Sequence, residues 1–307
     1  MSSTCIDIHP HIISDDDDRY PRAPLFGKQS DWSRERPVTI DDLIAAMDEA
    51  GVDKAAVVQS STCYGFDNTY VADAVAAHPG RLTAVGSVDL LQPSALQEIR
   101  DWADRGIAGL RLFTGGSTVA FDPSSLDDPR TFPAWELCGE MNLPMCVQTD
   151  PGGLAQVAGL AKRFPGVRII LDHLGRPDVL DGPPYKNASS LFGLAAFENI
   201  YLKLTPRIFN DAQRGKATPD TLFARLVEVF GCQRLAWGSN FPASDGSMAD
   251  NLARAQAGLA RLDDEQQSWV FAKTAQHLYP VLAESGDIAG VAAGGGWLMA
   301  EEAASDG

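Results

Sequence analysis

The chain has 307 residues, 45% of them hydrophobic and 21% charged, so it is long enough to bury a sizeable core. Its formal net charge of −16 disfavours nucleic acid and anionic membranes as partners, although a few arginines could make a cleft locally positive. No stretch of the sequence approaches the ~20 apolar residues that span a bilayer. The five scattered cysteines indicate reduced thiols and a cytoplasmic protein.

Short apolar runs alternate with longer stretches of helical periodicity along the chain. The eight runs cover residues 4–9, 54–59, 81–88, 108–113, 143–148, 167–173, 200–204 and 234–239. Helical patterns cover residues 39–51, 70–80, 93–106, 132–142, 153–166, 189–197 and 218–231. Such alternation predicts a parallel sheet buried on both faces. Eight strands predict an α/β fold, the single-domain (β/α)8 or TIM barrel, over residues 1–284, with a doubly wound sheet as the alternative.

Two segments stand outside this alternation. Residues 14–38 form a long polar insertion after the first strand, and its run from Asp15 to Asp18 is typical of a solvated surface. Residues 285–307 form an acidic C-terminal tail rich in Gly and Ala, which we expect to lie outside the barrel.

The first strand carries the clearest candidates for chemistry. Functional residues of a parallel barrel gather where its strands end. Because side chains alternate along a strand, Asp7, His9 and His11 share one face, while Ile6 and Ile8 are expected to face the helices. The two histidines therefore point to the barrel mouth, where they could bind a metal ion or a substrate carbonyl.

The end of the sixth strand adds a third histidine. The alternation from Val167 places His173 at the mouth, and Arg176 follows three residues later. A guanidinium there could bind a substrate carboxylate, or it could form a surface ion pair with Asp178.

Other polar side chains interrupt the apolar strands or follow them directly. Arg111 in the fourth strand either pairs with a buried acid or faces the ligand, because an unpaired buried guanidinium is costly. Lys203 repeats this pattern in the seventh strand, and Arg207 follows in its loop. We therefore add both side chains to the candidate substrate-binding residues.

The fifth and eighth strands end in uncharged amides. Gln148 and Asp150 share one face at the end of the fifth strand, and Asp150 could instead cap the Asp-Pro-Gly-Gly turn that it begins. Asn240 follows the eighth strand, where a polar group would face the mouth.

Over residues 4–282 the chain resembles the amidohydrolase superfamily, in particular the branch that contains the 2-pyrone-4,6-dicarboxylate lactonases and sulfomuconolactone hydrolases. The resemblance rests on five blocks in order: Asp7-x-His9-x-His11, Gly109 to Phe113, Asp172 to Pro177, Tyr201 to Leu204, and Trp237 to Pro242. It implies the same barrel and hydrolysis of a lactone, amide or ester.

The resemblance also implies roles for the histidines and arginines. In family members that use a metal, the first-strand histidines bind a divalent ion, here His9 and His11 with His173. In the pyrone lactonase type, three histidines polarise the carbonyl without a metal, and arginines hold the substrate carboxylates. The resemblance thus leaves open one divalent ion, zinc or manganese, that is weakly held or absent.

Two positions depart from the family pattern. Gln148 stands where many members have a histidine or lysine, and Asn240 stands where the family has the aspartate that activates water. An amide cannot take a proton near neutral pH. Asp150 is our candidate for the replacement base, with Asp245 in reserve.

We therefore expect a hydrolase that acts on a lactone, ester or amide of a small carboxylated molecule, such as one from aromatic catabolism. A metal-dependent, non-oxidative decarboxylase and a barrel that binds a small acid without turnover are the alternatives. Homo-oligomers are compatible with the sequence. Residues 14–38, 61–66 and 115–129 are expected to form the rim of the pocket.

Overall fold

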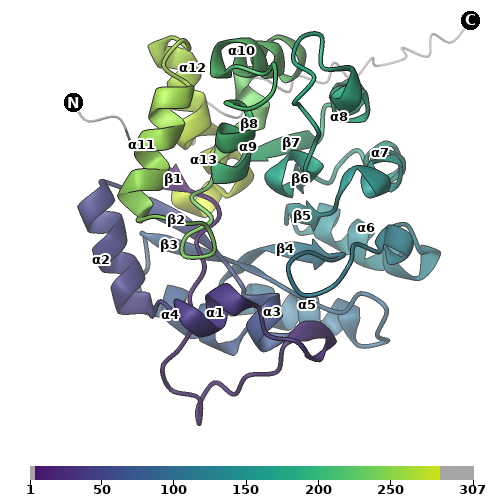
Figure 1. The fold of residues 1–307 in the computed structure, drawn as a ribbon. Helices are drawn as coiled ribbons and strands as arrows, with labels where there is room; N and C mark the ends of the chain where they lie inside the picture. The colour runs from purple at the N-terminus through teal and green to yellow at the C-terminus, as the bar shows by residue number, and fades with distance from the viewer. Residues whose placement is uncertain (1–3, 284–307) are drawn as a thin grey trace, which may run out of the picture.

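The computed structural model describes residues 4–283, in which eight parallel strands follow one another around a barrel (Figure 1). Each strand pairs with its neighbours in chain order, which confirms the expected (β/α)8 barrel. The strands are β1 (Ile6–Asp7), β2 (Lys54–Val58), β3 (Leu82–Gly86), β4 (Ile107–Phe113), β5 (Met145–Gln148), β6 (Ile169–Leu171), β7 (Ile200–Leu204) and β8 (Leu235–Trp237).

The last strand lies directly against the first. The backbone nitrogen of Ile8 donates to the carbonyl oxygen of Trp237 at 3.2 Å, and the nitrogen of Ser239 donates to the Asp7 carboxylate at 2.8 Å. A Cβ atom at Gly238 would lie only 2.6 Å from the Cβ of His9. Glycine is therefore required where β8 approaches the first candidate histidine.

Alternate strand residues face two separate apolar clusters. In β2, Ala56 and Val58 belong to the cluster inside the barrel, whereas Ala55 and Val57 pack against the surrounding helices. Tyr279, near the C-terminal end of the described residues, completes the inner cluster. The barrel interior is thus a filled core, and open space for a ligand is left at the ends of the strands.

Helices surround the strands (Figure 1). The helix α2 begins with a capping box between Thr39 and Asp42 and ends at Gly51, whose φ is 72°. The helices are α1 (Asp31–Glu35), α2 (Ile40–Ala50), α3 (Ser61–Tyr64), α4 (Thr69–Ala77), α5 (Ala95–Asp104), α6 (Phe132–Glu140), α7 (Leu154–Arg163), α8 (Ser189–Gly193), α9 (Pro206–Asp211), α10 (Pro219–Phe230), α11 (Met248–Gly258), α12 (Asp264–Ser268) and α13 (Thr274–Leu278).

One local expectation was wrong. Ile6 and Ile8 share one face, as alternation predicts, but both belong to the inner cluster instead of facing the helices. The register of β1 accounts for this, because Asp7 pairs with Ala55, whose side chain packs against the helices. The insertion at 14–38 has secondary structure of its own, the turn η1 (Leu25–Gly27) and the helix α1.

No helix within residues 4–283 is both long and apolar enough to cross a membrane. The expected domain boundary at residue 284 and the tail at 285–307 lie outside the described residues and stay predictions.

Candidate active site

Three histidine side chains meet where the strands end. The ring centroid of His9 lies 4.9 Å from that of His11 and 5.0 Å from that of His173. His9 and His11 follow β1, and His173 lies in the turn η5 (Asp172–Gly175) directly after β6. All three side chains are buried. The sequence pattern therefore identified residues that the fold brings into one cluster.

His173 reaches this cluster through an unusual turn rather than through the strand expected over residues 167–173. The strand β6 ends at Leu171, and His173, Leu174 and Arg176 follow with φ angles of 54°, 57° and 56°. Left-handed conformations cost energy in residues other than glycine and gather at functional sites. Two of these three strained residues, His173 and Arg176, carry side chains that were predicted to act.

Hydrogen bonds to the ring nitrogens assign the tautomers of two histidines. Nδ1 of His11 lies 2.8 Å from the carbonyl oxygen of Val58, which can only accept, so Nδ1 carries the proton and Nε2 has a free lone pair. Nδ1 of His9 lies 2.8 Å from Nζ of Lys203, which donates. The proton of a neutral His9 is therefore on Nε2, a buried atom without a partner in the described chain.

Burial keeps these rings neutral. Loss of water around the rings, followed by the nearby Arg111 charge, lowers the pKa of His11 to about 3. Burial is also the main reason that the pKa of His173 falls to about 3, although Asp172 opposes the shift. Burial and Lys203 place the pKa of His9 well below its usual value. At neutral pH the cluster offers uncharged imidazoles.

Asp172 is a completely buried carboxylate between two cations. Nζ of Lys203 lies 2.8 Å from its Oδ1, and Nε of Arg111 donates to its Oδ2 at 2.7 Å. Burial alone would raise the pKa of Asp172, but Lys203 and Arg111 hold it well below its usual value. The sequence alone predicted no separate role for Asp172, which appeared only within a motif. Two cations inside apolar strands were the signal that a buried acid must be near.

A cavity of about 220 Å³ opens beside the histidines. Arg111, Arg176 and Arg207 all line it, and no acidic side chain lines it within residues 4–283. The wall also includes His11, His173, Gln148, Asn240, Trp32, Ser60, Ser61, Thr62, Phe113, Ser117 and Ala243. Each predicted rim segment contributes, through Trp32, Ser61 and Ser117 respectively.

The three arginines differ in how far the protein already engages them. Arg111 bonds to Asp172 and to Oε1 of Gln148, yet its Nη1 makes no hydrogen bond within residues 4–283. It therefore both pairs with a buried acid and faces the cavity. Arg176 is stacked over the ring of Phe121, and its buried Nε has no partner in the described chain. Arg207 lies 3.6 Å from Asp211 and is half exposed.

The alternative considered for Arg176, an ion pair with Asp178, does not form. Asp178 instead accepts hydrogen bonds from the backbone nitrogen of Leu180 and from Nδ2 of Asn187. Burial and the neighbouring guanidinium of Arg207 lower the pKa of Arg176 from its usual value. A cation that is desolvated and unpaired in this way is well suited to a carboxylate ligand.

The two amide side chains at the strand ends, Gln148 and Asn240, are held in place by hydrogen bonds. Gln148 accepts from Arg111 and donates through Nε2 to the carbonyl oxygen of Gly115 at 2.8 Å. Asn240, with φ of 51°, donates through Nδ2 to Oγ of Ser244 at 2.8 Å, so its amide oxygen remains as an acceptor in the cavity wall.

Asp150 has the turn-capping contact. Its Oδ1 accepts from the backbone nitrogen of Gly152 at 3.0 Å, and its side chain is not part of the cavity wall. The reserve candidate, Asp245, is fully exposed in an ion pair with Arg36. Neither geometry supports the role of base that the sequence suggested.

A sequence model described as amidohydrolase matches residues 6–281. The chain belongs to the amidohydrolase family. This membership confirms the resemblance seen in the motifs and the expectation of an amidohydrolase-type enzyme.

Two curated relatives of this amidohydrolase are lactone hydrolases. The L-fucono-1,5-lactonase of Burkholderia ambifaria is 28% identical over 296 residues, which cover 92% of this chain and 97% of the relative. The 4-sulfomuconolactone hydrolase of Rhizobium radiobacter is 28% identical over 249 residues, which cover 73% of this chain and 77% of the relative.

Solved structures share the fold of this amidohydrolase. A protein from Pseudomonas putida, assigned as a 2-pyrone-4,6-dicarboxylic acid hydrolase, has a TM-score of 0.74 and 21% identity, over 92% of this chain and all of that chain. An amidohydrolase from Burkholderia multivorans with bound zinc has a TM-score of 0.73 and 21% identity, over 90% and 99% of the two chains.

Proposed function

We propose that this amidohydrolase hydrolyses a lactone of a small carboxylated molecule. The observation that carries the proposal is the convergence of three arginines on one cavity that also contains His11 and His173 and lacks an acidic side chain among the described residues. In a chain with a net charge of −16, such a cavity is a local exception that selects anions. The two curated lactonase relatives support the reaction type.

In this proposal the arginines hold the substrate carboxylate and His9 binds the lactone carbonyl oxygen. Nε2 of His9 is a buried donor without a partner in the described chain, and leaving it unpaired costs about 1–3 kcal/mol. A carbonyl oxygen that becomes negative during attack satisfies this donor best in the transition state. His9 therefore stabilises the developing oxyanion.

His11 takes the proton from the attacking water. The bond between the water oxygen and the carbonyl carbon forms, the ring C–O bond breaks, and the proton passes from His11 to the departing alkoxide, which yields a hydroxy acid. The lone pair on Nε2 of His11 allows this role, because its Nδ1 donates to Val58. The negative charge of the oxyanion nearby favours a protonated His11 during the reaction. The free amide oxygen of Asn240 orients the water.

The side chains do not fit a firmly held divalent ion, although a structural neighbour contains zinc. Within residues 4–283 no group of three or more His, Cys, Asp or Glu is placed to hold a metal. The His9 lone pair is used by Lys203, and the one carboxylate, Asp172, already has two cationic partners. We therefore derive no step through zinc or manganese and propose that any ion is held weakly.

The two alternatives have less support. A metal-dependent decarboxylase needs the ligand set that these residues do not form. A barrel that only bound an acid would not need the unpartnered Nε2–H of His9 beside the free lone pair on Nε2 of His11.

A panel of γ- and δ-lactones with and without a carboxylate tests the proposal. We expect turnover of carboxylated members, and at least about 100-fold lower kcat/KM for His11→Asn. Asp150→Asn serves as the matched control, since Asp150 only caps a turn. Full activity of His11→Asn, or loss of activity in Asp150→Asn with an intact fold, would reverse the assignment of the base.

The cellular setting is also proposed. The five cysteines are free and buried, which supports a reducing compartment such as the cytoplasm. A homo-oligomer stays a prediction.

A further inference from the structure

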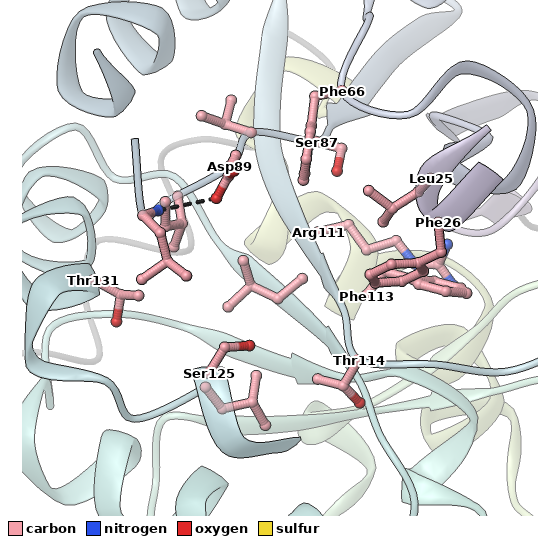
Figure 2. A pocket seen from close by; sticks show the side chains of 15 residues that line it. Leu25, Phe26, Phe66, Ser87, Asp89, Arg111, Phe113, Thr114, Ser125 and Thr131 are labelled. Carbon is pink, nitrogen blue, oxygen red and sulfur yellow. Dashed lines mark hydrogen bonds between the residues drawn. The ribbon is translucent and has the colours of Figure 1, made fainter. Parts of the chain in front are cut away.

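A second cavity of about 360 Å³ adjoins the candidate active site (Figure 2). Its walls come from the ends of β3 and β4, from the turn η1 and from the segment around Ser125. Arg111 and Phe113 line both cavities. Any group in the second cavity therefore lies next to a ligand held by the arginines.

The second cavity is mainly apolar, and its mouth is apolar as well. Five large hydrophobic side chains within residues 4–283 are exposed, and three of them, Phe26 (57%), Phe66 (38%) and Leu91 (37%), line this cavity. Exposed apolar side chains that gather at one hollow indicate a binding surface, whereas scattered ones are ordinary.

Three of the polar side chains in its wall, Asp89, Thr114 and Thr131, are engaged by the protein. Asp89 accepts from the backbone nitrogen of Leu91 at 3.1 Å, as the dashed line in Figure 2 marks, and from Gln92. Hydroxyl groups of Thr114 and Thr131 each donate to a backbone carbonyl oxygen at 2.8 Å. The cavity thus offers a ligand mainly apolar contact.

The conformation of Phe26 is a further sign of function. Its φ of 62° is left-handed, which is a genuine outlier for a bulky residue, and its ring centroid lies 6.4 Å from that of Phe113. Strain of this kind is found at ligand clamps. In Figure 2 the rings of Phe26 and Phe113 lie beside the guanidinium of Arg111.

We propose that the substrate carries an apolar arm, aryl or alkyl, which binds between Phe26, Phe66 and Phe113 while its carboxylate binds the arginines. This inference rests on the proposed lactone hydrolysis and narrows its substrate class. A cavity of roughly 150 Å³ lined by apolar side chains is enough for benzene. The observed volume of about 360 Å³ accommodates a phenyl ring or a chain of several carbons.

A polyhydroxylated arm does not suit this cavity. Its hydroxyl groups would lose water and find few free partners, because Asp89, Thr114 and Thr131 are already bonded and most of the remaining wall is apolar. We therefore expect sugar lactones to be poor substrates compared with lactone carboxylates that bear an aryl or alkyl group.

Two measurements on the full chain test this inference. The first compares kcat/KM for a γ-lactone carboxylate and for the same lactone with a phenyl or pentyl substituent. The second compares the Kd of 3-phenylpropanoate with that of propanoate by calorimetry and requires no turnover. We expect the apolar group to improve each value by roughly 10–100-fold.

Filling the cavity should remove this preference. Ser125→Trp places an indole in the cavity from an exposed position, and the adjacent Ser124→Trp, outside the cavity wall, is the matched control. Leu91→Asp is a second, independent variant at the mouth. Ser125→Trp and Leu91→Asp should bind 3-phenylpropanoate no better than propanoate, while Ser124→Trp keeps the difference.

The outcomes separate this inference from the proposed function. Equal affinity of the wild-type protein for the two acids overturns the apolar arm, even if simple lactone carboxylates are hydrolysed. If no lactone is hydrolysed, lactone hydrolysis fails, and the two acids still decide whether the second cavity binds an apolar arm. A preference that survives in both Ser125→Trp and Leu91→Asp also overturns the assignment to this cavity.

Discussion

Lys203 donates to Nδ1 of His9 over 2.8 Å, and this contact sets which ring nitrogen of His9 carries the proton. The same amine lies 2.8 Å from Asp172. Lys203 is therefore a positioning residue: it turns His9 into an Nε2–H donor and links it to the buried carboxylate.

Replacing this lysine should affect both stability and chemistry. Lys203→Met leaves Asp172 with one cationic partner, and breaking a buried ion pair costs about 3–5 kcal/mol of unfolding free energy. With His9 no longer held, kcat/KM should fall about 100-fold. Chemical denaturation and steady-state kinetics measure the two effects.

A second variant separates positioning from folding. Lys203→Met combined with Asp172→Asn should recover part of the lost stability, because the unpaired charge is gone, but it should not recover activity. The ¹⁵N spectrum of labelled histidines reports the His9 tautomer directly. An unchanged tautomer with unchanged kinetics in Lys203→Met would show that the contact is merely structural.

Arg176 should act mainly on substrate binding. Arg176→Met removes a charge-assisted bond to a carboxylate worth about 1.5–3 kcal/mol, so kcat/KM should fall roughly 10–100-fold. The melting temperature should barely change, because Asp178 is bonded elsewhere. Arg225→Met, at an exposed pair with Glu228, is the control. A large loss of stability with normal kinetics contradicts a role in binding.

The sequence predicted the barrel well because its signals are local and repeated. Each apolar run became a strand within a few residues, since burial on both faces requires continuous apolar segments. Ile6 and Ile8 do share one face, but alternation alone does not say which face of a strand points into the barrel, and the register of β1 with β2 decides it. The turn at His173 was not predicted either, since left-handed conformations in residues other than glycine leave little trace in a sequence.

The site was predictable as a set of residues and not as a network. His9, His11, His173 and the arginines stood out as polar groups at strand ends, and the fold brings them together. The contacts of Asp172 with Lys203 and Arg111 join segments that are far apart in sequence, so pairing could not be read from spacing. Asp150 is the converse case, because the capping contact that its local turn signal indicated is present in the structure.

Stability should fall as the pH is lowered from neutral. His11 and His173 have pKa values near 3 in the folded state and about 6.5 when unfolded, so the unfolded chain binds more protons below pH 6.5. Their stabilising contribution is full above 6.5 and is lost towards pH 3. Burial raises the pKa of Asp7 to about 6, so this residue opposes the trend between about pH 4 and 6. It is one group against two histidines, and the trend therefore remains.

The unfolding free energy should therefore be at least about 1–2 kcal/mol lower at pH 4.5 than at pH 7. Urea denaturation across this range measures it, and His11→Gln should show a shallower dependence on pH. A flat profile in the wild-type protein would mean that these rings are not buried in neutral form.

Activity should survive removal of divalent ions. The His9 lone pair is used by Lys203, and Asp172 is shared by two cations, so affinity for zinc or manganese is low. Dialysis against a chelator should leave substoichiometric metal by elemental analysis and unchanged kcat. Loss of activity that zinc restores would contradict this reading of the ligand set.

Asn240 offers a gain-of-function test of the cavity wall. Its amide oxygen can orient a water but cannot take a proton, whereas a carboxylate at the same position can do both. Asn240→Asp should therefore keep or raise kcat, with an increase as the pH rises through the pKa of the new carboxyl group. The left-handed φ of 51° is tolerated by Asp nearly as well as by Asn, so the fold should be retained.

Asn240→Ala is the matched control, which should lose roughly 10-fold in kcat/KM through the lost hydrogen bond. A folded but inactive Asn240→Asp would place the attacking water elsewhere, on the side of His173 rather than Asn240.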